Sequence, residues 1–285
     1  MVNIGILIAS YNRKDATLEC LSILKQCELV AAVNSTTVLF DDGSTDGTSV
    51  AIEKYFPDVH IVHGNGDAFW AHSMAQAEKY LMSISDDIDY ILWLNDDVKL
   101  DPNSIERLIT CSERNRNSII VGAVREPGTH RASYGGFRQH PTKPLKFLSV
   151  NPGPHDLVVD TFNGNVVLVP ISAARTIGGI DGSYAHALAD IDYGMRGRAL
   201  GISSILAPLT FGDCPRNPTP PWRGIRSEFR AFTNKKGGGH PSSLMRILRK
   251  IRPTTWPAHF ASIYMSWVYK ASKRQIKLYI AQYQK

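Results

Sequence analysis

Residues 3–12 read NIGILIASYN, an apolar run of strand length that ends in a polar break. A run this short and rich in Ile favours a buried strand, because buried helices usually need about ten residues or more. Similar runs occupy residues 36–40, 59–62 and 90–94. The segments between them have the apolar spacing of helices, at residues 15–26, 45–55 and 71–82, and a further helix is expected from Asp101-Pro102.

Strands that alternate with helices predict an α/β fold with a parallel sheet and helices on both faces. Ligands of such sheets bind outside the carboxyl ends of the strands. Because polar residues follow each strand, we expect them to converge on one cleft. These clusters are Tyr11-Asn12, Asp41-Asp42, Asn65-Gly66-Asp67 and Asn95-Asp96-Asp97. The alternation fails after about residue 125, where Gly, Pro, His and Arg are frequent, so antiparallel or edge strands are expected there.

Charge divides the 285 residues into two parts. From Phe229 onward there are 12 Lys and Arg and no Asp or Glu, whereas residues 1–228 hold 20 basic and 26 acidic residues. This predicts an acidic main domain at 1–228, and a basic, aromatic-rich helical extension at 229–285. Such an extension suits an anionic membrane surface, although its aromatic residues could instead pack on the domain. The acidic domain argues against a nucleic-acid partner.

The location predicted from the sequence is cytoplasmic, at the inner face of the cell membrane. The four cysteines have no metal-binding or disulfide spacing, which is typical of reduced thiols. The N-terminal apolar run lacks a basic leader, so no signal peptide is expected. No apolar stretch reaches the roughly 18 residues that span a bilayer, so we expect peripheral association.

Three acidic clusters are candidates for chemistry. Asp96 and Asp97 follow a buried strand, and adjacent carboxylates there need a cation or hydrogen bonds to offset their repulsion. Oxygen ligands suit Mg²⁺ or Mn²⁺. Asp190 and Asp192 are two positions apart, so on a helix they do not share a face, and one of them can pair with Arg196. Each cluster taken alone is equally compatible with turns and helix caps.

Five stretches together carry a resemblance: IGILIASYNR (4–13), FDDGSTDGT (40–48), GNGDAFW (64–70), WLNDDV (93–98) and GGIDGSYAHALADIDYGMRGRALG (178–201). The chain resembles the family 2 glycosyltransferases, an inverting group with the GT-A fold, and is similar to rhamnosyltransferases of bacterial glycan assembly. The GT-A fold combines a Rossmann-like nucleotide-binding half with a mixed sheet. The resemblance implies a UDP- or dTDP-linked sugar donor, a glycan or lipid-linked saccharide acceptor, and Mn²⁺ or Mg²⁺.

The resemblance also implies roles for individual residues. The nucleotide and donor sugar would contact Ala9, Tyr11, Asn12, Arg13, Asp41, Asp42, Asn65, Gly66, Asp67 and Asp96. The metal would be bound by Asp97, the last residue of the family's DxD motif, and by Asp213. The acceptor would contact Gly164, Asn165, Trp70 and His186. Ala189 stands where the family has Glu, so the catalytic base would be either Asp190 or Asp192.

The implied reaction is a single metal-assisted displacement that inverts the anomeric carbon. The family's downstream His has no clear counterpart, and Asp213 stands roughly in its place. A nucleotidyltransferase is disfavoured because SYNRKD is not a Gly-rich phosphate loop, and a dehydrogenase because no GxGxxG follows the first strand. A non-catalytic nucleotide-sugar-binding or assembly subunit is the alternative that Ala189 keeps open.

Overall fold

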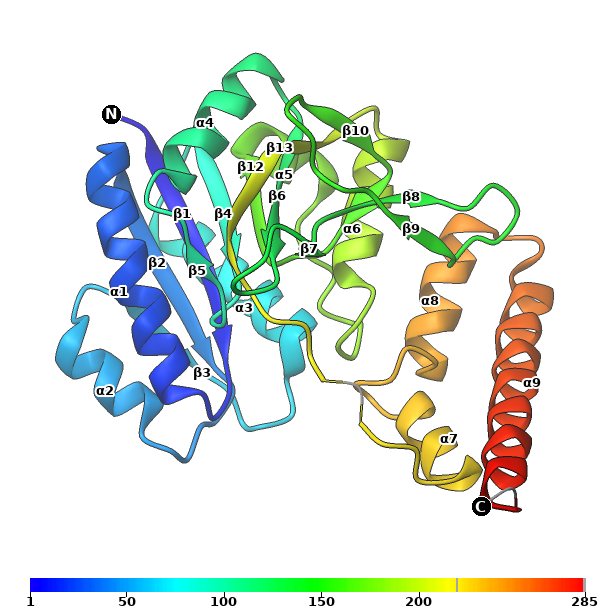
Figure 1. The fold of residues 1–285 in the computed structure, drawn as a ribbon. Helices are drawn as coiled ribbons and strands as arrows, with labels where there is room; N and C mark the ends of the chain where they lie inside the picture. The colour runs from blue at the N-terminus through cyan, green and yellow to red at the C-terminus, as the bar shows by residue number, and fades with distance from the viewer. Residues whose placement is uncertain (219, 284–285) are drawn as a thin grey trace.

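The computed structural model describes residues 1–218 and 220–283 (Figure 1). Thr219, in the predicted loop 213–221, and Gln284 and Lys285, at the end of the predicted extension, lie outside the described residues. The strands are β1 (Asn3–Ser10), β2 (Asn34–Asp41), β3 (His60–His63), β4 (Tyr90–Leu94), β5 (Lys99–Leu100), β6 (Ile119–Arg125), β7 (Ala132–Tyr134), β8 (Gly136–Gln139), β9 (Phe147–Ser149), β10 (Leu157–Val159), β11 (Thr161–Phe162), β12 (Val166–Pro170) and β13 (Ser204–Asp213). The helices are α1 (Lys14–Ala31), α2 (Thr48–Tyr55), α3 (Phe69–Ile84), α4 (Ser104–Arg114), α5 (Ile171–Ile177), α6 (Ala189–Ala199), α7 (Ile225–Thr233), α8 (Pro241–Ile251) and α9 (Trp256–Tyr283).

The main sheet is mixed, with strand order β10-β13-β6-β12-β4-β1-β2-β3. Strands β3, β2, β1 and β4 are parallel to one another, as the alternation of strands and helices predicts. β12 then pairs antiparallel with both β4 and β6. A second sheet of three strands, β11-β8-β9, comes from the region after residue 125. The predicted α/β class with a mixed sheet is therefore confirmed.

Both faces of the main sheet are buried, because side chains alternate along each strand. Ile4, Ile6 and Ile8 of β1 face a cluster that includes residues of α1, α2 and α4. Leu7 belongs to the cluster on the opposite face, together with residues of α3, α5 and α6. Two buried faces explain why β1 is an almost continuous apolar run rather than an alternating one.

One predicted helix start is wrong. The expected helix from Asp101-Pro102 begins only at Ser104, with Asn103 as its N-cap. The chain is still extended before that point, because Leu100 pairs with Gly212 of β13 and the Asp101 N–H donates to the Phe211 carbonyl at 2.9 Å.

The predicted C-terminal extension does not separate cleanly from the rest of the fold. α7 runs across the predicted boundary at residue 228. α8 contributes the fully buried Ile247 to the same core cluster as Leu7 of β1. α9 lies beside α8 at one side of the molecule (Figure 1). None of the described helices is both long enough and apolar enough to cross a bilayer.

The inner face of α9 is aromatic. Trp267 stacks on Phe232 of α7 with ring centroids 5.2 Å apart, and Tyr264 contacts both Phe229 and Phe232 of the same helix. The Tyr264 hydroxyl donates to the Gly239 carbonyl at 2.6 Å. Part of the predicted aromatic content therefore packs within the C-terminal helices rather than pointing outward.

A substitution inside α8 should destabilise the domain built on the main sheet. Ile247→Ala removes a fully buried side chain from the core cluster of the sheet, so unfolding should cost about 2–5 kcal/mol less. Urea unfolding followed by tryptophan fluorescence measures this. Ile276→Ala in α9 is the matched control, because Ile276 is 59% exposed and its truncation should change stability by no more than about 0.5 kcal/mol. Equal stabilities of the two variants would contradict a shared core.

Candidate active site

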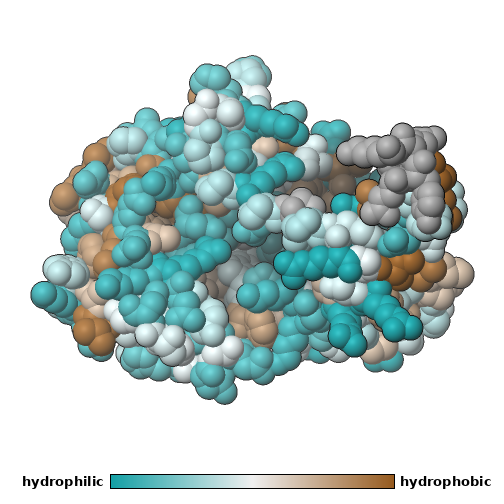
Figure 2. Space-filling model, turned by 60° about the horizontal axis from the view of Figure 1, so that its bottom comes forward, coloured by the Kyte–Doolittle hydropathy of each residue, from teal (hydrophilic) through white to brown (hydrophobic). Residues whose placement is uncertain are grey.

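A cavity of about 620 Å³ opens at the carboxyl ends of the parallel strands. Viewed toward these strand ends, the molecular surface is hollowed near its centre (Figure 2). The cavity is lined by residues from β1, the turn after β2, the segments after β3 and β4, the turn before β12 and the start of α6. The predicted site residues in its walls are Ala9, Tyr11, Arg13, Asp42, Gly66, Trp70, Asp96, Asp97, Gly164, Asn165, His186 and Asp190.

Asp41 and Asp42, which the sequence could not tell apart, have different surroundings. Asp42 lines the cavity, and its buried carboxylate accepts backbone N–H groups of Gly66, Ala68 and Phe69 at 2.9–3.1 Å. Asp41 points into its own turn, where it accepts the Ser44 N–H at 2.9 Å and the Ser49 hydroxyl. Asp41 is thus placed to stabilise the turn that presents Asp42.

Asn12 also stabilises this turn. Its side-chain oxygen accepts the Thr45 N–H at 2.8 Å, and its own N–H donates to the Ser44 hydroxyl at 2.8 Å. Asn12 is not among the residues that line the cavity, whereas its neighbour Tyr11 is, with 47% of its surface exposed.

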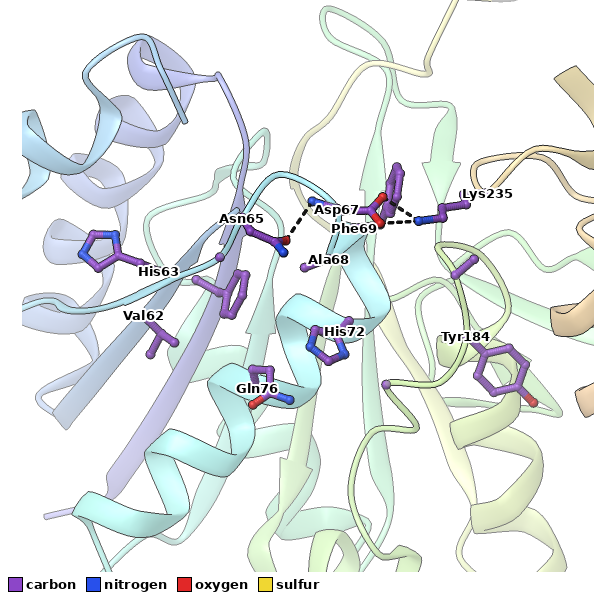
Figure 3. A pocket seen from close by; sticks show the side chains of 14 residues that line it. Val62, His63, Asn65, Asp67, Ala68, Phe69, His72, Gln76, Tyr184 and Lys235 are labelled. Carbon is purple, nitrogen blue, oxygen red and sulfur yellow. Dashed lines mark hydrogen bonds and ion pairs between the residues drawn. The ribbon is translucent and has the colours of Figure 1, made fainter. Parts of the chain in front are cut away.

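Asn65 and Asp67 face a different cavity, of about 730 Å³, which Phe69 also lines (Figure 3). Asp67 forms an ion pair there with Lys235, which comes from the turn between α7 and α8. Lys235 and Lys236 also lie over the Phe69 ring, 5.4 and 5.7 Å from its centroid. Of the three residues predicted from the GNGD segment, only Gly66 lines the central cavity.

Arg13 bridges the two adjacent carboxylates after β4. Its guanidinium lies 3.0 Å from Asp96 and 2.8 Å from Asp97. Burial raises the pKa of Asp96 to about 6, and the charge of Arg13 opposes that rise. The side chain of Asp96 is 6% exposed and that of Asp97 is 28% exposed. Asp97 is therefore the carboxylate that a ligand in the cavity can reach.

The residues around Asp97 fit a hard divalent cation only in part. Within residues 1–218 and 220–283, no three His, Cys, Asp or Glu side chains cluster as a metal site. Mg²⁺ and Mn²⁺ can bind through one or two carboxylates, with substrate phosphates and waters as the other ligands. A partly exposed carboxylate that faces a roomy cavity meets that requirement, so Asp97 fits a cation shared with a diphosphate.

Asp213 does not take part in this arrangement. It ends β13, its carboxylate lies 2.7 Å from the guanidinium of Arg125, and it is absent from the cavity walls. The next residue, Cys214, is the one that reaches Asp97, with its sulfur 3.6 Å from the carboxylate.

Asp190 is the second carboxylate in the cavity. It stands in the first turn of α6, accepts the Ile191 N–H at 2.8 Å and accepts the Gly164 N–H at 3.1 Å. Burial raises its pKa, which makes the carboxylate a better proton acceptor. Gly164 has to be glycine, because a Cβ there would come within 2.6 Å of the Trp70 ring.

Asp192 points away from the cavity. Its carboxylate accepts the Tyr184 hydroxyl at 2.9 Å and pairs with Arg196 and Lys250 at 2.8 Å each. The sequence predicts that one of the two acids pairs with Arg196, and Asp192 is the acid that forms this i, i+4 ion pair. Lys250 belongs to α8, so Asp192 also ties α6 to the C-terminal helices.

The predicted acceptor residues line the wall between the two cavity carboxylates. The Trp70 indole N–H donates to the Asn95 side chain at 2.9 Å, and the Asn95 N–H donates to the Asn165 carbonyl at 3.0 Å. Burial lowers the pKa of His186, and its Nδ1 has no hydrogen-bond partner among the described residues. The lining residues that escaped prediction include Asn163, Asn217 and Lys236.

Comparisons with known proteins agree with this geometry. In Mycobacterium tuberculosis, the N-acetylglucosaminyl-diphospho-decaprenol L-rhamnosyltransferase of strains CDC 1551 and H37Rv is 24% identical over 196 residues. That match covers 61% of this chain and 64% of the relative, which is less than two thirds of the relative's length.

Two solved structures share the fold. The S. aureus TarS 1-349 structure in complex with UDP-GlcNAc has a TM-score of 0.58 and 11% identity, over 88% of this chain and 66% of that one. The mannosyltransferase PcManGT of Pyrobaculum calidifontis, in complex with GDP-Man and Mn²⁺, has a TM-score of 0.55 and 16% identity, over 92% of this chain and 69% of that one. The predicted GT-A fold is thereby confirmed. Residues 5–167 match the glycosyl transferase family 2, and the chain belongs to that family.

Proposed function

We propose that the protein is an inverting glycosyltransferase that moves a sugar from a nucleotide-sugar donor to a hydroxyl group of a saccharide acceptor. One observation carries the proposal: Asp97, which follows β4, and the buried Asp190, at the start of α6, line the same cavity. A transferase needs a site for a diphosphate and a proton acceptor for the incoming hydroxyl in one cavity.

The proposed mechanism assigns one task to each wall. The donor nucleotide binds against Ala9, Tyr11, Asp42 and Gly66, and Arg13 together with Lys236 faces its phosphates. A Mg²⁺ or Mn²⁺ ion at Asp97 would neutralise charge that develops on the departing diphosphate. Asp190 accepts the proton of the acceptor hydroxyl as its oxygen attacks the anomeric carbon from the face opposite the leaving group. A single displacement of this kind inverts the anomeric configuration.

The substrates proposed are a UDP- or dTDP-linked sugar and a glycan or lipid-linked saccharide. The M. tuberculosis relative is by name a rhamnosyltransferase that acts on a lipid-linked N-acetylglucosaminyl diphosphate. A deoxyhexose donor and a diphospho-lipid acceptor are therefore the first pair to test for this chain.

We also propose that the protein acts at the inner face of the cell membrane, through the outer face of α9. Met265, Val268, Tyr269 and Ile276 point outward there and are 51–68% exposed. The exposed cations Lys270, Lys273 and Lys277 run along one flank of this apolar stripe. Apolar surface appears beside hydrophilic side chains at the edge of the molecule that α9 occupies (Figure 2). With no Asp or Glu after Glu228, the stripe is complementary to anionic lipids rather than to a second basic copy of itself.

The two acids of α6 should behave differently when each is neutralised. Asp190→Asn should lower kcat/KM by about a hundredfold to ten-thousandfold, because the base is lost, while nucleotide binding and thermal stability persist. Asp192→Asn should lower the unfolding temperature, because Arg196 and Lys250 lose a buried partner. Steady-state kinetics and thermal melts of both variants test this. Full activity in Asp190→Asn, with the loss confined to Asp192→Asn, would reassign the base.

Nucleotide binding should depend on metal through Asp97. A nucleoside diphosphate present at about 100 times its Kd should stabilise the folded protein by about 2.7 kcal/mol. We expect this stabilisation with one of UDP, dTDP or GDP in the presence of Mn²⁺, and expect Asp97→Ala to lose it. Asp213→Ala is the comparison variant, because Asp213 does not line the cavity. A metal-dependent shift that survives in Asp97→Ala and disappears in Asp213→Ala would contradict the assignment.

Binding to lipid should require the basic flank of α9. Replacing Lys270, Lys273 and Lys277 by Gln should reduce co-sedimentation with phosphatidylglycerol-containing vesicles at least about tenfold, since each lysine near an anionic surface contributes about 1 kcal/mol. Gln substitution of the exposed Lys25, Lys79 and Lys143 changes the net charge equally and should leave binding nearly unchanged. An equal loss of vesicle binding in both triple variants, or binding only to neutral phosphatidylcholine vesicles, would contradict the proposal.

A further inference from the structure

A separate cavity of about 760 Å³ adjoins the active site. Its walls come from the segment around β7 and β8, the turn after β9 and the loop after β13. These are the irregular parts of the chain in which no motif could be read from the sequence. Asn163 and Asn217 line both this cavity and the one that holds Asp97 and Asp190. The two cavities therefore share part of their walls.

Asn163 connects the adjoining cavity with the base. Its side chain lies close enough to the Asp190 carboxylate to oppose the rise in the pKa of that group, and its backbone N–H donates to the Gly135 carbonyl at 2.9 Å. Gly164, the next residue, donates its N–H to the same carboxylate. A molecule that fills the adjoining cavity and extends past Asn163 would thus bring a hydroxyl group to Asp190.

The polar and aromatic lining suits a sugar ring. Amide side chains of Asn151, Asn163 and Asn217 can both donate and accept hydrogen bonds with hydroxyl groups. Tyr134 and Phe137 supply aromatic rings, and the Tyr134 hydroxyl accepts the Asn217 N–H at 3.2 Å. A site with apolar rings and a few well-placed polar groups is the usual composition of a small-molecule pocket.

Two arginines give this cavity an unneutralised positive charge. Arg131 and Arg216 are exposed, line the cavity and form no ion pair with any residue in the described part of the chain. One guanidinium nitrogen of Arg216 lies 3.5 Å from the Ala132 carbonyl. The nearby Glu126 accepts the backbone N–H of Arg216 rather than its guanidinium. By contrast, Arg13 and Arg125 beside the active site are each paired with two aspartates.

We infer that this cavity is the acceptor site and that Arg131 and Arg216 select an acceptor saccharide that carries an anionic group. The inference rests on the proposed transferase function and adds the cavity and the two side chains that would recognise the charge of its second substrate. Arginine binds phosphate and carboxylate oxygens through paired, charge-assisted hydrogen bonds, so a glycosyl phosphate or a uronic acid would supply the matching anion.

Direct binding with the donor site filled tests the inference. The full chain would be saturated with the nucleoside diphosphate and Mn²⁺ that stabilise it, so that an added anion cannot occupy the donor site. Three probes would then be titrated by calorimetry: an alkyl N-acetylglucosaminyl diphosphate, methyl glucuronoside and the neutral alkyl N-acetylglucosaminide. We expect one anionic probe to bind at least about tenfold more tightly than the neutral one. The probe that binds more tightly then shows whether the anionic group of the acceptor is a phosphate or a carboxylate.

The arginine variants decide whether this preference comes from the cavity. Arg131→Gln combined with Arg216→Gln should abolish the preference and raise the acceptor KM at least about tenfold, with the donor KM unchanged. Arg116→Gln is the matched control, because Arg116 is an exposed arginine that precedes β6, at the end of that strand remote from this cavity. Equal binding of all three probes by the wild type, or a preference that survives in the double variant, would overturn the inference. Absence of any nucleotide-induced stabilisation would instead overturn the proposed function itself.

Discussion

The active site depends on the buried carboxylate of Asp42. It accepts three backbone N–H groups at the start of α3, where the positive end of the helix dipole favours a negative charge. These bonds fix Phe69, which has a positive φ of 54° that a bulky residue rarely adopts without support. The next residue, Trp70, donates to Asn95 and packs against Gly164, which donates to Asp190. One carboxylate at the end of β2 thus positions the part of the cavity wall that contacts Asp190.

A second constraint is the electrostatics of Asp96 and Asp97. Two adjacent carboxylates at the end of a buried strand repel each other, and Arg13 offsets that repulsion from the neighbouring β1 turn. Arg13 is 43% exposed, so it can turn toward a ligand without leaving an apolar core. The same guanidinium balances Asp97 and is accessible from the cavity.

The sequence predicted the parallel half of the sheet well, because each of its strands is a local apolar run followed by a polar break. It could not rank Asp41 against Asp42, since which of them faces the cavity depends on backbone N–H groups more than twenty residues away. It did predict that Asp190 and Asp192 lie on different faces of one helix. It also placed Arg196 four residues after Asp192, at the spacing of the ion pair that these two residues form. Strands β6 and β13 were missed, and Lys236 lies in a Gly-rich turn whose position is set by α7 and α8. These features arise from contacts between distant segments, which local patterns do not contain.

Ile247 of α8 lies in the same core cluster as Leu7 of β1, about 240 positions apart in the 285-residue chain. Lys235 and Lys236 likewise reach Phe69 from near the end of the chain. Contacts of such high sequence separation form slowly, because a long loop has to close before they can stabilise anything. During synthesis the nucleotide-binding half leaves the ribosome first, yet its core and one wall of its cavity stay open until α8 has emerged. The nascent chain therefore exposes apolar surface of this core until α8 has been made.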